Sequence, residues 1–228
     1  ETGWDPARVT STLQSVSASR DACDPAAAAG ALGLQPGGYF LCAGSIEPRK
    51  NIRALVAAHA ASGVMAPLVL AGPDGWRAAA ELRDAGPGVR RVPWLPRAGL
   101  VGLMAGAKAV LMPSLAEGFG LPVAEAMALG VPTLASQGGA LEEIAGGASL
   151  LVDAGDVRGM AAAVAALDGD AGLRADLAAR GLRRAAAFTP AAHARRVLAV
   201  YASVVPSQDG AVSAAAWPGR APSAGPRG

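Results

Sequence analysis

Residues 113–132 read PSLAEGFGLPVAEAMALGVP and directly follow the apolar run Ala109–Met112. The stretch begins as a polar turn, passes through the glycines around Phe119, and continues as a short apolar helix. Pro122 suits the first turn of that helix, and Gly130 with the proline two residues later ends it. Free backbone amides at a helix start, approached through flexible glycines, form a binding site for phosphate or another anion.

Two glutamates flank these amides. Glu117 lies in the turn, and Glu125 lies about one turn inside the helix, roughly 5 Å of axial rise from the first amides. A carboxylate beside a phosphate is repelled, but it can accept hydrogen bonds from neutral hydroxyls such as those of a ribose. Taken singly, each acid is explained as well by a turn cap or a solvated helix residue. Together with the glycines and the helix start, the two acids indicate nucleotide binding.

A second candidate site is the stretch AGSIEPRKN at residues 43–51, where an apolar strand turns into a helix. Gly44 lets the backbone come close to a ligand, and Ser45 offers a hydroxyl. Arg49 and Lys50 lie at the helix start, where the helix dipole disfavours cations, so we expect an anion such as a diphosphate to compensate them. The stretch is not a Walker A loop, because it lacks the second glycine and the hydroxyl residue after the lysine.

The whole chain alternates short apolar runs with helical segments. The runs are continuously apolar, which indicates strands covered on both faces. We therefore predict an α/β fold, a doubly wound parallel sheet (Rossmann-like) with crossover helices, in which ligands bind outside the carboxyl ends of the strands. The predicted strands are Tyr39–Gly44, Pro67–Ala71, Val89–Val92, Ala109–Met112, Thr133–Ala135 and Ser149–Val152. Predicted helices include Pro25–Gly33, Val157–Leu167, Ala171–Ala187 and Ala191–Val204.

Length and composition fit one globular domain. The chain has 228 residues, of which 52% are hydrophobic and 17% charged, enough for one sizeable core. The chain begins without a methionine, and we expect residues 1–36 to be a loose lead-in at a fragment edge with one short helix. Residues 37–205 should form the domain, and residues 206–228, rich in Pro, Gly, Ser and Ala, a disordered tail.

Charge and cysteine content argue against several classes of protein. A net charge of +2 without a basic run does not indicate nucleic-acid binding. Cys23 and Cys42 lie in unlike surroundings, which favours a reducing compartment over a disulfide. The apolar run Gly99–Ala116 carries Lys108 and Pro113, so we do not interpret it as a transmembrane segment. No signal peptide is visible.

Residues 168–170, Asp-Gly-Asp, match the DxD motif that binds a metal ion in some enzymes. They fall between two predicted helices, far from any strand end, so we interpret them as a polar turn. We assign no metal ligand.

The sequence resembles the retaining glycosyltransferases of the GT-B fold, family 4. The resemblance runs from about Tyr39 to Phe188 and rests on the E-x7-E motif of Glu117 and Glu125. It rests also on AGSIEPRKN at 43–51, LVLAGPDGW at 68–76 and SQGGALEEIAGG at 136–147. These blocks occur in the order and spacing of the family's C-terminal, nucleotide-sugar-binding domain. The resemblance implies the donor-binding half of an enzyme that moves a sugar from a nucleoside-diphosphate sugar, GDP-mannose-like or UDP-linked, to a glycan or lipid-linked acceptor.

The resemblance also implies residue roles. Arg49 and Lys50 would hold the diphosphate, Glu125 the ribose, and Glu117 the sugar hydroxyls, with the backbone at Leu95 contacting the base. Many relatives have an arginine where Ser45 stands. The implied catalytic residues are Glu117, Lys50 and Arg49, and the implied substrate-binding residues are Gly44, Ser45, Leu95, Gly118, Phe119, Gly120, Leu121 and Glu125. No cofactor and no obligatory metal is expected, because fixed cations and amides stabilise the leaving group.

The family enzymes carry an N-terminal acceptor domain before this one. We therefore expect the present chain to be a fragment that is inactive without that domain. The resemblance further implies polysaccharide biosynthesis in the cytoplasm, with the full-length protein peripheral at the inner membrane face. The alternative is a non-catalytic nucleotide- or phosphate-binding module of the same fold. A Rossmann dehydrogenase is disfavoured, because no G-x-G-x-x-G follows a strand.

Overall fold

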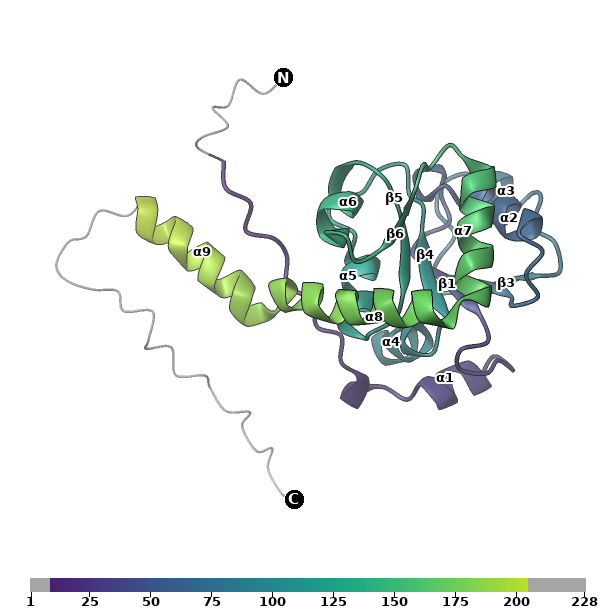
Figure 1. The fold of residues 1–228 in the computed structure, drawn as a ribbon, viewed down its shortest axis with the longest axis horizontal. Coiled ribbons are helices and arrows are strands. Elements are labelled where there is room, and N and C mark those ends of the chain that lie inside the picture. The colour runs from purple at the N-terminus through teal and green to yellow at the C-terminus, as the bar shows by residue number, and fades with distance from the viewer. Residues whose placement is uncertain (1–8, 205–228) are drawn as a thin grey trace, which may run out of the picture.

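The computed structural model describes residues 9–204 (Figure 1). Residues 1–8 of the predicted lead-in and the predicted tail at 206–228 lie outside the described residues. Within 9–204 the chain forms a six-stranded parallel sheet in the order β3-β2-β1-β4-β5-β6. The strands are β1 (Phe40–Ala43), β2 (Leu68–Ala71), β3 (Val89–Val92), β4 (Ala109–Met112), β5 (Thr133–Ser136) and β6 (Leu150–Val152). The six predicted strands and the α/β fold class are confirmed.

Burial explains the composition of the strands. Every residue of the four inner strands, β1, β2, β4 and β5, is buried, because helices cover both faces of the sheet. The edge strands β3 and β6 are only partly buried. On β3, Arg91 reaches across the edge and donates hydrogen bonds to the carbonyls of Leu70 (2.9 Å) and Gly72 (3.2 Å). The sheet therefore accommodates this charged residue on an edge strand, which has a neighbouring strand on one side alone.

The helices form two layers around the sheet (Figure 1). On one face α2, α3 and α7 pack together, and on the other α5 and α6 pack together with α4 beside them. Outside this second layer, α1 packs on α4 and α8 packs on α5. The bounds are α1 Pro25–Gly30, α2 Ile52–Ala61, α3 Ala78–Glu81, α4 Arg97–Ala105, α5 Leu121–Ala128, α6 Gly139–Ala145, α7 Val157–Gly169, α8 Ala171–Ala185 and α9 Pro190–Val204.

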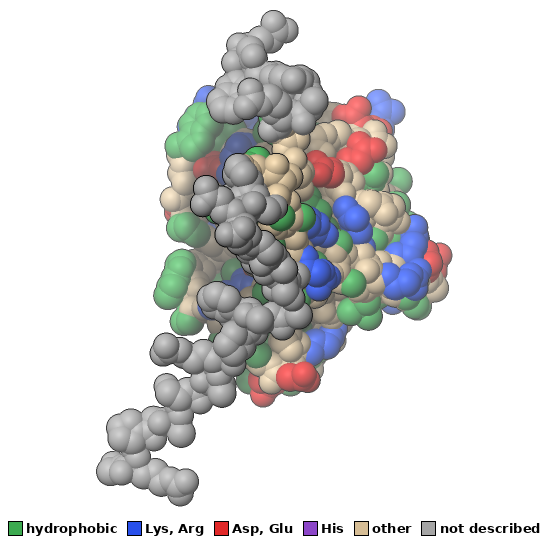
Figure 2. All heavy atoms as spheres, turned by 90° about the vertical axis from the view of Figure 1, so that its left-hand side faces the viewer, with side chains coloured by type: hydrophobic (Ala, Val, Ile, Leu, Met, Phe, Trp, Pro, Cys, Tyr) green, Lys and Arg blue, Asp and Glu red, His purple; other side chains and the backbone are tan. Residues whose placement is uncertain are grey.

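The C-terminal helix α9 extends away from the two layers (Figure 1). It follows the short 3-10 helix η4 (Ala186–Phe188), and of its residues only Ala192 is buried. Figure 2 shows the face of the molecule on this side, where basic, acidic and hydrophobic side chains all reach the surface. No helix within residues 9–204 is both long enough and apolar enough to span a bilayer.

Residues 9–36 carry more structure than the loose lead-in predicted from the sequence. They contain the 3-10 helix η2 (Arg20–Ala22) as well as α1. The amide of Val16 donates to the carbonyl of Phe188 (2.8 Å), and the guanidinium of Arg20 donates to the carbonyl of Leu129 (2.6 Å). Buried side chains such as Val16, Ala29 and Leu34, together with these hydrogen bonds, hold the segment against the domain, although its sequence shows no regular apolar period.

The sheet reverses its direction of growth between β1 and β4. These two strands are neighbours in space, although β2 and β3 separate them in the chain. In α/β sheets, ligands bind outside the carboxyl ends of the strands at such a reversal. The loop that begins at Gly44 follows β1, and the loop that begins at Pro113 follows β4. The two stretches singled out in the sequence therefore face one another at this point, which we call the switch point.

Two glycines allow the loops after β1 and β2 to lie in contact. Gly72, at the carboxyl end of β2, has φ +149°, and a Cβ added there would lie 2.1 Å from the backbone oxygen of Gly44. That distance is far inside van der Waals contact with backbone that cannot move aside. A side chain at residue 72 would push the β2 loop away from the switch point.

We predict that Gly72→Ala lowers the free energy of unfolding by about 2–4 kcal/mol, because it combines a backbone clash with an unfavourable φ. The matched control is Gly30→Ala, at the end of α1, where an added Cβ meets nothing within 4 Å. The control should be neutral or stabilising by up to about 1 kcal/mol. Urea unfolding of both variants measures the difference, and equal stabilities would contradict the close packing of the two loops.

Candidate functional site

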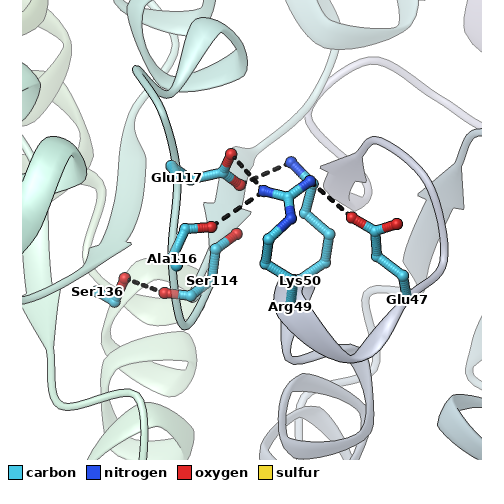
Figure 3. Close-up of polar contacts among 7 residues, drawn as sticks. All are labelled: Glu47, Arg49, Lys50, Ser114, Ala116, Glu117 and Ser136. Atoms are coloured by element: carbon cyan, nitrogen blue, oxygen red, sulfur yellow. Dashed lines mark hydrogen bonds and ion pairs between the residues drawn. The ribbon is translucent and has the colours of Figure 1, made fainter.

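Lys50 and Glu117 meet across the switch point (Figure 3). Lys50 ends the 3-10 helix η3 (Pro48–Lys50), and Glu117 lies in the loop between β4 and α5. The lysine Nζ lies 2.6 Å from Oε1 of Glu117, and the two side chains are only 9% and 8% exposed. Gly44 leaves room for this lysine, because a Cβ there would lie 3.2 Å from its Cε. The carboxyl edge of the sheet thus holds a nearly buried ion pair.

Arg49 extends this pair into a network of four charges (Figure 3). Its Nη1 lies 2.9 Å from Oε2 of Glu117 and also donates to the carbonyl of Ala116 (3.0 Å). Its Nη2 lies 2.6 Å from Oε1 of Glu47. Two cations and two carboxylates therefore neutralise one another. The sequence suggested a bound anion as the partner of the cations, and in the structure Glu117 and Glu47 take that place.

The environment of Glu117 favours its charged form. Burial raises the pKa of this carboxyl, but hydrogen bonding and charge from Lys50, together with Arg49, outweigh burial and leave the pKa below its ordinary value. The Ser114 hydroxyl also favours the carboxylate. The same hydroxyl is buried, yet within residues 9–204 no atom lies in hydrogen-bonding geometry with its oxygen. We therefore attribute the stabilisation of the charge mainly to the two cations.

Asn51 holds the two loops of the switch point together. Its Nδ2 donates to the carbonyl of Pro113 (3.0 Å) and to the carbonyl of Ala154 (2.8 Å), which follows β6. The residue has φ 57°, a left-handed conformation that asparagine tolerates better than most residues. An asparagine before a helix normally caps it, but this side chain makes no cap hydrogen bond to α2. The sequence analysis gave Asn51 no role, because only the tertiary structure shows which carbonyls it reaches.

Glu125 lies apart from this network. It is the fifth residue of α5, and its side chain is 11% exposed. Its Oε1 lies 2.8 Å from Nη2 of Arg97, the first residue of α4. The two acids of the E-x7-E motif therefore have separate cationic partners. The sequence analysis did not single out Arg97, although a cation at a helix start was the same signal that drew attention to Arg49 and Lys50.

The loop between the two acids is anchored at one side and open at the other. Gly120 has φ +98° and precedes α5, and a Cβ there would lie 2.5 Å from Cδ2 of Leu141. Phe119 packs edge-on against Phe188, with ring centroids 5.8 Å apart. A Cβ at Gly118 would meet no atom within 4 Å. The backbone of Gly118 and the exposed Leu121 at the helix start are thus accessible at the switch point.

The remaining predicted site residues lie on loops at the same edge of the sheet. Ser45 is half-buried directly after Gly44. Leu95, also half-buried, follows β3, two strands away from β1 and therefore roughly 10 Å along the sheet. Because Leu95 lies two residues before Arg97, the Arg97–Glu125 pair connects its loop to α5. The predicted residues thus form two groups, Leu95 and Glu125 connected through Arg97, and the Lys50–Glu117 pair on the loops after β1 and β4.

A cleft of about 330 Å³ opens beside Glu117. The loop at 114–117 lines it on one side, and residues 136–141, from the end of β5 to the first turn of α6, line it on the other. The amide of Gly138, which lines this cleft, donates a hydrogen bond to Oε2 of Glu142 (2.6 Å). Space for a ligand therefore exists next to the ion pair, but this one donor is used within the protein.

The DxD-like sequence has structural contacts. Asp168 pairs with Lys108 (2.5 Å), and Asp170 caps α8 by accepting a hydrogen bond from the amide of Leu173 (2.8 Å). Across the described part of the chain, no group of three or more His, Cys, Asp or Glu side chains is arranged to hold a metal ion.

Comparison with known proteins finds one matching family model and several relatives named as mannosyltransferases. The family model described as "Glycosyl transferases group 1" matches residues 37–170. The O-antigen chain mannosyltransferase B of Escherichia coli is 37% identical over 161 residues, which cover 67% of this chain and 42% of that protein. The lipopolysaccharide core biosynthesis mannosyltransferase LpsB of Rhizobium meliloti is 40% identical over 94 residues, covering 39% of this chain and 27% of that protein.

Solved structures share the fold. Sucrose-phosphate synthase from Thermosynechococcus elongatus superposes with a TM-score of 0.67 at 28% identity, covering 80% of this chain and 50% of that one. HepE of Anabaena, solved with UDP and glucose, superposes with a TM-score of 0.69 at 20% identity, covering 82% of this chain and 53% of that one. The present chain thus spans about half the length of these structures, and 42% of the E. coli relative.

The lowered pKa of Glu117 gives a prediction for stability against pH. A carboxyl whose pKa falls on folding stabilises the folded state above its ordinary pKa of 4.5 and loses that contribution as the pH falls through the folded value. Near neutral pH, Glu117→Gln should unfold more easily than the parent by about 2 kcal/mol, because it leaves Lys50 nearly buried without its charge partner. Below pH 4.5 the difference should shrink, because the carboxyl of the unfolded parent takes up a proton first, and it should be lost once the pH falls below the lowered pKa of the folded parent. Urea unfolding across this range measures it, and a constant difference would contradict the ion pair.

Proposed function

This chain belongs to the glycosyl transferases group 1, whose family model covers more than half of it, and on that premise we propose that it is the donor-binding half of a retaining glycosyltransferase. The donor is a nucleoside-diphosphate sugar, GDP-mannose-like or UDP-linked. The acceptor is a glycan or a lipid-linked acceptor. Mannosyltransferases among the relatives, and the UDP and glucose bound in a structure of the same fold, support this choice of substrates.

The observation that carries the proposal is the position of the Lys50–Glu117 pair. It lies at the carboxyl edge of the sheet where β1 and β4 diverge, with the start of α5 beside it. The cations Lys50 and Arg49 lie next to the amides at the start of α5. Both the cations and the amides stabilise negative charge, so the position suits a diphosphate. Glu125, further along α5, is placed to accept hydrogen bonds from the ribose.

Donor binding then exchanges one set of ion pairs for another. Lys50 and Arg49 leave Glu117 and contact the diphosphate oxygens, and the freed Glu117 carboxylate accepts hydrogen bonds from hydroxyls of the sugar. As the bond between sugar and diphosphate breaks, negative charge develops on the leaving phosphate. The two cations and the backbone amides at Gly118–Leu121 stabilise that charge without an obligatory metal. Gly44 and Ser45 line the same loop, and the backbone at Leu95 contacts the base.

The remaining parts of the proposal concern the whole protein. The transfer belongs to polysaccharide biosynthesis and takes place in the cytoplasm, with the protein peripheral at the inner face of the membrane. A facing acceptor domain completes the active site. This chain spans about half of its relatives' length, and this share supports the proposal that the relatives' remaining length includes such a domain.

The diphosphate role of Lys50 has a direct test. Lys50→Ala should weaken binding of UDP or GDP by about 1.5–3 kcal/mol, the contribution of one charge-assisted contact, and leave binding of the nucleoside nearly unchanged. Lys108→Ala is the matched control, because it removes the chain's other lysine. Lys108 pairs with Asp168 and precedes β4, so it lies at the amino ends of the strands, away from the switch point. Calorimetric titration measures both variants. An equal loss for nucleotide and nucleoside would rule out the diphosphate role.

We also expect the 228-residue chain to bind a nucleotide sugar but to transfer nothing, because a half-site neither orients the acceptor nor excludes water. Mass spectrometry of the chain with nucleotide sugars and a broad acceptor mixture detects released nucleotide and glycosylated product. Acceptor-dependent turnover on the order of 1 per second or more would show that no facing domain is needed. Turnover by a longer protein that carries such a domain separates an enzyme from a non-catalytic nucleotide-binding module.

A further inference from the structure

Arg97 lies where its own helix disfavours it. It is the first residue of α4, where the positive end of the helix dipole repels a cation, and the preceding Pro96 makes no side-chain cap. Its Nη2 nevertheless lies 2.8 Å from Oε1 of Glu125 on α5. The Arg97 side chain is 50% exposed, and exposed ion pairs contribute little to stability. The stability of α4 therefore does not explain this arginine.

The contacts of Arg97 connect three segments that are distant in sequence. The same Nη2 atom that faces Glu125 also donates to the carbonyl of Ser17 in the N-terminal segment (3.1 Å). Through the chain itself, Arg97 is two residues from Leu95 on the loop after β3. The guanidinium thus contacts the Ser17 carbonyl and the Glu125 carboxylate, while the backbone of Arg97 continues the loop after β3, so that the side chain links Glu125 to that loop.

Glu117 and Glu125 differ in how many of their carboxylate oxygens are paired with a cation. Both oxygens of Glu117 are paired, Oε1 with Lys50 and Oε2 with Arg49. Glu125 uses Oε1 for Arg97, and its Oε2 has no ion-pair partner among residues 9–204. A carboxylate that is held by one oxygen and free at the other is oriented to accept a hydrogen bond from a ligand hydroxyl.

We infer that Arg97 is a positioning residue, which orients the Glu125 carboxylate toward the ribose and couples ribose recognition to the base-binding loop. The inference rests on the proposed function, because it assigns Arg97 a part in the same nucleotide site. Arg97 itself touches no ligand in this arrangement and acts through Glu125. Loss of Arg97 leaves the carboxylate free to rotate, so the hydrogen bond to the ribose loses its fixed geometry.

The experiment compares ribonucleotides with analogues that lack the ribose hydroxyls. The 228-residue chain is titrated calorimetrically with UDP and GDP and with their 2′,3′-dideoxy forms. For the nucleotide that binds, the readout is the affinity for the ribonucleotide divided by the affinity for its dideoxy analogue. Arg97→Met also adds uncompensated negative charge near the phosphates, but this change affects both ligands alike. The ratio therefore isolates the effect on the ribose.

We expect the parent to prefer the ribonucleotide by about tenfold or more, the effect of one hydrogen bond to a charged group. Arg97→Met should bring the ratio close to one, as should Glu125→Gln, and the double variant should lose no more than either alone because the two residues act as a unit. Arg97→Lys should restore part of the preference. Arg53→Met, which removes the exposed ion pair between Arg53 of α2 and Asp84 after α3, is the matched control and should keep the parent's ratio.

The possible failures are distinguishable. Failure of the parent to bind any nucleoside diphosphate would overturn the proposed function, and this inference with it. A parent that binds nucleotides without preferring the ribose hydroxyls would remove the role of Glu125 and therefore that of Arg97. Thermal unfolding checks that Arg97→Met is folded. If the parent prefers the ribonucleotide and the folded Arg97→Met variant keeps that preference, the positioning role alone is wrong.

Discussion

The Lys50–Glu117 ion pair is the contact on which the arrangement of the site depends. It bridges the loops after β1 and β4 at the point where the sheet reverses direction, and both side chains are nearly buried. Burying two charges is costly unless each has its partner. The chain meets that condition through Gly44, which leaves room for the Lys50 side chain, and through Asn51, whose hydrogen bond to Pro113 holds the two loops together.

The same electrostatic conflict recurs at two helix starts. Arg49 and Lys50 lie directly before α2, and Arg97 opens α4, so all three cations face the positive end of a helix dipole. In both places a glutamate of the E-x7-E motif neutralises them. Cations placed against the dipole are better explained by an anionic or hydroxyl-bearing ligand than by the stability of the helices.

The self-neutralised network also bears on how a donor would bind. A diphosphate must replace Glu117 as the partner of Lys50 and Arg49, so the net gain is the difference between two sets of charge-assisted contacts. Glu117 then becomes available in the cleft beside it. The proposed exchange thereby links recognition of the diphosphate to recognition of the sugar, since the carboxylate cannot serve both cations and hydroxyls fully at once.

The sequence by itself determined the fold class, the six strands and the two motif stretches, because continuous apolar runs, glycines and prolines are local signals that the buried sheet requires. It also identified Lys50, Arg49, Glu117 and Glu125 as the residues of interest. Only the tertiary structure decided their partners: Glu117 for the two cations, Arg97 for Glu125, and the carbonyls of Pro113 and Ala154 for Asn51. The packing of residues 9–36 was likewise invisible in the sequence. These contacts join residues up to more than 100 positions apart, and their geometry depends on strand order and loop approach, which no local pattern encodes.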